Sequence, residues 1–141
     1  MPTRTELQHI SISRLEEAKI LLAAGKADGA AYIVGYVLET ALKARICKIL
    51  NMGYPDTGEI SKSFLTHKYP ILIKLAGLEN DLNAKKNASV TFATNWSLVS
   101  EWSEIKRYEI IGTSSAVDVA NIINALEDQT DGVLTWIQTL W

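Results

Sequence analysis

Cysteine and histidine are scarce in this chain of 141 residues, which contains one cysteine and two histidines. The single cysteine, Cys47, has no partner for an internal disulfide, so nothing in the sequence indicates an oxidising compartment. The two histidines, His9 and His67, lie far apart in the sequence, and no carboxylate cluster at ligand spacing accompanies them. We therefore expect a cytoplasmic protein without a metal site.

Long apolar runs are also missing. The first residues, MPTRTELQHI, lack the apolar core of a signal peptide, and no run approaches the about 20 apolar residues that a membrane span requires. Glycine-rich phosphate loops, serine nucleophile elbows and HExxH motifs are absent as well. The sequence thus predicts no membrane association and no cofactor.

An excess of charge of either sign is lacking too. The net charge is -2, and 48% of the residues are apolar while 21% are charged, which is typical of an ordinary globular chain of one domain, residues 1–141. This balance argues against unspecific coating of DNA, so any contact with nucleic acid has to be local. The local basic clusters are Lys43 with Arg45 and Lys48, Lys85 with Lys86, and Lys106 with Arg107.

The spacing of apolar residues along most of the sequence is typical of amphipathic helices. Apolar residues recur every three or four positions from Leu7 to Ala24, and again from Ala30 to about Asn51. Gly25 separates these two stretches by a short turn, so the sequence predicts two antiparallel neighbouring helices. Residues 53–66 contain glycine and proline and are typical of a crossing loop.

Three further helices are predicted in the second half of the chain. One begins near Thr66 and ends at Gly77, one spans residues 79–102, and one runs from a capping box at Ser115 and Asp118 to the end of the chain. We therefore expect an all-α, up-and-down bundle of about five helices.

The second predicted helix has two different faces. At 100° per residue, Tyr32, Tyr36, Glu39 and Lys43 form one stripe opposite the aliphatic face. One interpretation is a solvated Glu39–Lys43 pair with half-buried tyrosines. The other is a binding site or a subunit interface. His67 stands at the start of the third helix, where capping or packing is a commoner role than catalysis.

Residues 103–111, SEIKRYEII, form a segment in which basic and aromatic residues are neighbours. Lys106, Arg107 and Tyr108 follow closely after Trp102 and fit either the end of a helix or a binding site.

The stretch RLEEAKILLAAGKADGAAYIVGYVLETALKARI, residues 14–46, resembles the first helical hairpin of the HEPN (higher eukaryotes and prokaryotes nucleotide-binding) family. The resemblance covers nearly the whole chain. The matching positions are Gly35, Tyr36, Glu39, Leu42, Lys43 and Ala44, then His67 at the head of a short helix, Trp102 followed by Arg107 and Tyr108, and Trp136 with Ile137 near the end.

The resemblance implies a helical bundle that pairs as a homodimer, in a family of metal-independent ribonucleases, toxins encoded beside nucleotidyltransferase antitoxins, and inactive binding relatives. Its ribonuclease members carry, late in the chain, an arginine followed within a few residues by a histidine. Here no histidine follows Arg107. The arrangement of the family also implies that Arg107 lies near the second helix and pairs there with Glu39.

These observations lead to three functional hypotheses. The first is a dimeric HEPN-like protein that binds a nucleotide or RNA in a toxin–antitoxin or defence system, with Arg107, Lys43 and Tyr36 at the phosphate and a nucleotidyltransferase as partner. The second is a divergent metal-independent endoribonuclease in which Glu39, His67 and Tyr108 are catalytic. The third is a structural helical adaptor.

Overall fold

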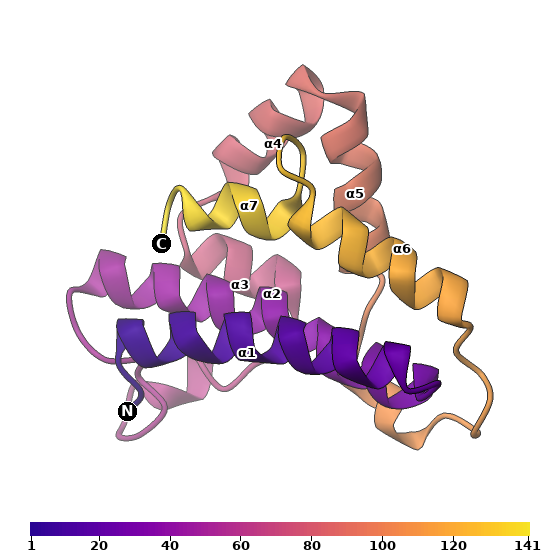
Figure 1. Cartoon of the computed structure of the whole chain (residues 1–141). Helices are drawn as coiled ribbons and strands as arrows, with labels where there is room; N and C mark the ends of the chain where they lie inside the picture. The colour runs from indigo at the N-terminus through magenta and orange to yellow at the C-terminus, as the bar shows by residue number, and fades with distance from the viewer.

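The computed structural model describes all residues, 1–141, and is built from helices without any strand (Figure 1). The helices are α1 (Arg4–Ala23), α2 (Ala27–Leu50), α3 (Tyr69–Leu75), α4 (Glu79–Ala88), α5 (Val90–Ser100), α6 (Ala116–Glu127) and α7 (Val133–Gln138), with short 3-10 helices η1 (Ser61–Ser63) and η2 (Glu104–Tyr108). The prediction of an all-α fold is confirmed. The predicted number of about five α-helices is too low, because there are seven.

Both additional helices arise from breaks that the periodicity did not reveal. At Ser89 the backbone is extended, and the Ser89 hydroxyl caps α5 by accepting a hydrogen bond from the Phe92 amide at 3.1 Å. The same hydroxyl donates to the Asp131 carboxylate at 2.7 Å. In the turn between α6 and α7, the Asp128 carboxylate accepts from the amides of Thr130 and Asp131. These side-chain contacts replace the backbone bonds of a continuous helix.

The predicted helix starts are otherwise close to the observed ones. The amide of Asp118 donates to the Ser115 hydroxyl at 3.0 Å, so Ser115 caps α6 where it was expected. The Asp118 side chain accepts no bond from the Ser115 amide, so the return half of the predicted capping box is missing. Helix α3 begins at Tyr69, three positions after Thr66, and carries Pro70 in its first turn.

Helices α1 and α2 form a long antiparallel hairpin that runs across the molecule in Figure 1. Gly25 turns the chain between them with a φ of 76°, a conformation that glycine adopts without a steric penalty. Within the hairpin the buried Ser11 hydroxyl donates to the Val37 carbonyl at 2.7 Å, which satisfies a polar group in an otherwise apolar contact.

Helix α2 is the centre of the core, because α1, α3, α6, α7 and η2 all pack against it. Leu38, Leu42 and Ile46 are completely buried.

Cys47 is 2% exposed, and this burial raises the pKa of its thiol, which disfavours the reactive thiolate. No helix combines the length and apolar character needed to cross a membrane.

One of the basic clusters serves the fold. The Arg45 guanidinium and the Lys48 ammonium both donate to the Leu140 carbonyl, at 2.9 and 3.0 Å. These two cations therefore tie the segment after α7 to the end of α2.

Candidate functional site

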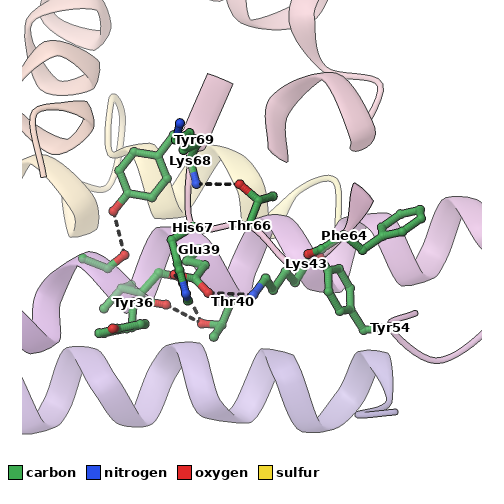
Figure 2. Close-up of polar contacts among 12 residues, drawn as sticks. Tyr36, Glu39, Thr40, Lys43, Tyr54, Phe64, Thr66, His67, Lys68 and Tyr69 are labelled. Carbon is green, nitrogen blue, oxygen red and sulfur yellow. Dashed lines mark hydrogen bonds and ion pairs between the residues drawn. The ribbon is translucent and has the colours of Figure 1, made fainter. Parts of the chain in front are cut away.

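Three polar side chains, Glu39, Lys43 and His67, meet on one side of α2 (Figure 2). The Glu39 carboxylate accepts from the Lys43 ammonium at 2.6 Å through Oε1, and its Oε2 lies 2.9 Å from His67 Nδ1. The Glu39 side chain is only 4% exposed, whereas that of His67 is 48% exposed. The predicted stripe thus contains a buried carboxylate whose partners lead outward to the surface.

The buried carboxylate fixes the orientation of the His67 imidazole. An ionised carboxylate can only accept hydrogen bonds, so Nδ1 of His67 carries a hydrogen in this contact. The opposite nitrogen, Nε2, then remains for a ligand, as an acceptor in the neutral imidazole and a donor in the imidazolium.

The loop before α3 holds His67 in this position. The buried Tyr54 hydroxyl donates to the Phe64 carbonyl at 2.8 Å, and the Lys68 amide donates to the Thr66 hydroxyl at 3.1 Å. The Lys43 ammonium lies 5.1 Å from the centre of the Tyr54 ring as well as against Glu39. Lys43 therefore connects the loop to α2, and most of its charge is already compensated within the chain.

Tyr36 lies beside His67 and links it to further aromatic rings. Its ring centre is 6.2 Å from that of His67, 5.3 Å from Tyr32 and 5.1 Å from Trp102, each in an edge-to-face arrangement. Burial raises the pKa of the Tyr36 hydroxyl, and its hydrogen bond with Tyr32 acts in the same direction. The Tyr36 hydroxyl is therefore neutral and able to donate.

Gly35 allows Trp102 to lie directly on the backbone of α2. A Cβ atom at Gly35 would be 1.9 Å from two ring atoms of Trp102, so no larger residue fits there without a shift. The Trp102 indole donates to the Ala31 carbonyl at 3.0 Å, and the Tyr69 hydroxyl donates to the Gly35 carbonyl at 2.6 Å. Tyr69 was not recognised in the sequence, although its position two residues after His67 is a signal that could have found it.

Arg107 and Tyr108 belong to η2 and are exposed, with Tyr108 at 78%. The Arg107 guanidinium lies over the Tyr108 ring, 5.1 Å from its centre, and neither side chain makes a hydrogen bond or ion pair within the chain. The positive charge of Arg107 acts on Tyr36, where it opposes the rise of the pKa of the hydroxyl. Arg107 is thus placed on the Tyr36 side of the site.

The expected pair between Glu39 and Arg107 is wrong. Both oxygens of Glu39 have other partners, Lys43 and His67, and Glu39 is buried while η2 lies at the surface. His67 is the direct partner of Glu39 and remains 48% exposed. Tyr108 is 78% exposed, and no hydrogen bond or ring contact joins its side chain to Glu39 or His67.

Two hollows are lined by residues of this region. His67, Lys68, Ser103 and Glu104 line one of about 210 Å³, and Tyr36 itself lines the other, of about 510 Å³, on the side of α1. No three histidine, cysteine or carboxylate side chains are grouped as a metal would require. The arrangement can hold an anion, and it can transfer a proton at His67.

Comparisons with protein-family models, curated proteins and solved structures gave no match.

Proposed function

We propose that this is a HEPN-like protein that binds RNA or a nucleotide through its phosphate at His67 and Arg107. The observation that carries the proposal is the His67 imidazole, which the buried Glu39 carboxylate holds through Nδ1 while the side chain is 48% exposed. Burying a carboxylate costs free energy, and two apolar residues would fill this position at less cost if only packing were needed.

Two cations without an ion pair support this proposal, Arg107 on the Tyr36 side of the site and Lys68 beside His67. The Arg107 guanidinium has all its hydrogen-bond donors available, in the planar geometry that suits phosphate oxygens. Lys68 is exposed and lines the same hollow as His67. A chain with a net charge of -2 does not attract phosphate as a whole, so binding of RNA or a nucleotide depends on local positive charges such as these.

A second candidate is a metal-independent endoribonuclease, which the Glu39–His67 contact specifically favours. A carboxylate that orients an imidazole is a recurrent arrangement in general acid–base catalysis. His67 would take the proton of a ribose 2′-hydroxyl, whose oxygen would attack the adjacent phosphorus and expel the 5′-oxygen of the next nucleotide, leaving a 2′,3′-cyclic phosphate. Water would supply the proton for the departing 5′-oxygen, and the neutral Tyr36 hydroxyl would donate to the developing charge on the phosphate. Cleavage of RNA in the presence of a chelator, lost in His67→Ala, is the result that identifies this activity.

The proposal includes a homodimer and a nucleotidyltransferase-type partner in a toxin–antitoxin or defence pair. Trp96 and Trp102 are 9% and 5% exposed, so a single chain already covers both indole rings. Three of the exposed apolar side chains, Ile105, Ile110 and Ile111 at 65%, 84% and 93% exposure, lie close together in the sequence around η2 and are available to a second copy. Light scattering that shows only a 15.6 kDa species would contradict the dimer, and an adjacent nucleotidyltransferase reading frame would support the partner.

Titration of a fluorescently labelled single-stranded RNA tests the proposed binding. Arg107→Ala should weaken the affinity by about tenfold or more, because each charge-assisted hydrogen bond to phosphate contributes about 1.5–3 kcal/mol. Lys86→Ala removes the same charge from α4, which Figure 1 shows far from η2, and should change the affinity little. Unchanged binding by a folded Arg107→Ala protein would remove Arg107 from the site. Absence of any binding by the unmodified protein would favour the structural adaptor.

A further inference from the structure

The hollow on the side of α1, which Tyr36 lines, has the lining of a pocket for a flat ring. Its volume is about 510 Å³, and its walls include Ile10, Arg14 and Glu17 from α1 and Tyr32, Ile33 and Tyr36 from α2. Apolar side chains, two phenol rings and one pair of opposite charges thus surround the same space.

The two tyrosines form a corner. Their ring planes are 83° apart with centres at 5.3 Å, so a flat ligand that stacks on one ring meets the other at its edge. Their hydroxyls lie 3.0 Å apart, and one of them donates to the other. The second hydroxyl hydrogen has no acceptor within the chain and is available to a ligand.

The charged pair supplies donors and acceptors side by side. Arg14 Nη1 lies 2.7 Å from both carboxylate oxygens of Glu17, and the two side chains are 37% and 43% exposed. Glu17 Oε2 keeps a free lone pair, and the guanidinium keeps the hydrogens of Nη2 and Nε. Glu17 Oε1 also accepts from the Ser13 hydroxyl at 3.3 Å, a long contact that a ligand N–H would replace. This combination matches a ring with two N–H groups next to a carbonyl.

Guanine has that pattern. Its N1–H and 2-amino groups donate, which suits Glu17, and its O6 and N7 accept, which suits Arg14. Adenine presents an unprotonated N1 on the same edge and would face the Glu17 carboxylate with an acceptor. Stacking on a tyrosine holds either base, so the carboxylate decides between them.

We infer that this hollow is a base pocket selective for guanine, in single-stranded RNA or in a free guanine nucleotide. The inference rests on the proposed function, because the Tyr36 ring lines this pocket and also lies edge-to-face against the His67 ring of the phosphate site, with ring centres 6.2 Å apart. The base lies against Tyr32 and Tyr36, and the phosphate that follows it reaches His67 and Arg107.

Isothermal titration of the full chain with GMP, AMP and the single-stranded pentamers UUGUU and UUAUU tests the inference. UUGUU should bind about tenfold more tightly than UUAUU, which is the discrimination expected of one good paired contact to a base edge. Glu17→Gln should remove this preference without lowering the melting temperature, and Tyr32→Ala should weaken both pentamers. Glu16→Gln is the matched control, because Glu16 is the exposed neighbour without an ion pair.

The outcomes separate this inference from the proposed function. Equal affinity for the two pentamers, lowered by Arg107→Ala but not by Tyr32→Ala, would overturn the guanine pocket and leave the phosphate site in place. Binding of GMP but of neither pentamer would support the pocket and assign it to a free nucleotide. No binding of any of the four probes would overturn both.

Discussion

Replacing Gly35 by alanine should destabilise the protein, although alanine is the better helix former. In an unconstrained helix the change from glycine to alanine contributes up to about 1 kcal/mol of stability. Here the new methyl group would lie 1.9 Å from two ring carbons of Trp102, and the indole is too rigid to give way by bending. Trp102 would have to leave its buried position on α2.

The cost follows from what Trp102 loses. It is 5% exposed, stacks on Tyr69 with ring centres 6.0 Å apart, and donates to the Ala31 carbonyl. Complete loss of a buried tryptophan costs about 3–5 kcal/mol. After subtraction of the helix-propensity gain, Gly35→Ala should lower the free energy of unfolding by about 2–4 kcal/mol, a fall in melting temperature on the order of ten degrees.

Urea unfolding followed by circular dichroism measures this change, and Gly29→Ala is the matched control on the same helix. A Cβ at Gly29 would lie 3.6 Å from Leu21, an ordinary contact, so this variant should be as stable as the original or up to about 1 kcal/mol more stable. The double variant Gly35→Ala/Trp102→Ala should lose less than the sum of the single losses, because both act on one contact. A Gly35→Ala protein as stable as Gly29→Ala would refute the reasoning.

Three further predictions concern the polar contacts. Tyr69→Phe should lower the free energy of unfolding by about 1 kcal/mol, because it removes a buried hydrogen bond to α2. Burial raises the pKa of the Tyr69 hydroxyl above 10.0, so its contribution to stability is full below pH 10.0 and falls as the pH rises. Urea titrations of Tyr69→Phe should therefore show a smaller loss of stability at alkaline pH than those of the original protein. Glu39→Gln should lower the free energy of unfolding by about 1–3 kcal/mol, and a change no greater than that of the exposed Glu16→Gln would contradict a structural pair with His67. The amides of Gly112 and Ser114 donate to the Asp28 carboxylate and lower its pKa, so the stabilising contribution of Asp28 is present above pH 3.8 and is lost as the pH falls further. Hydrogen exchange at these two amides should therefore become faster in acid and in Asp28→Asn. Protection of the two amides that does not depend on pH would refute this prediction.

The helical fold class was predictable because it depends on short-range patterns. The apolar spacing in α1 and α2 defines a face that has to be buried, and Gly25 and Gly77 stop helices at positive φ values of 76° and 66°. The break at Ser89 has no such local mark. It depends on the contact between Ser89 and Asp131, which are brought together only by the folded chain.

The candidate site divides in the same way. Helical geometry alone places Tyr36, Glu39 and Lys43 on one stripe, because residues three and four positions apart share a face. Helical geometry does not determine which residue from elsewhere in the chain pairs with the Glu39 carboxylate, and the prediction that this residue is Arg107 was wrong. The tertiary structure decided this, because the loop before α3 brings His67 to the buried oxygen of Glu39 while η2 keeps Arg107 at the surface. Periodicity follows from hydrogen bonds between near neighbours in the chain, whereas the choice of a partner 28 residues away depends on the packing of the whole molecule.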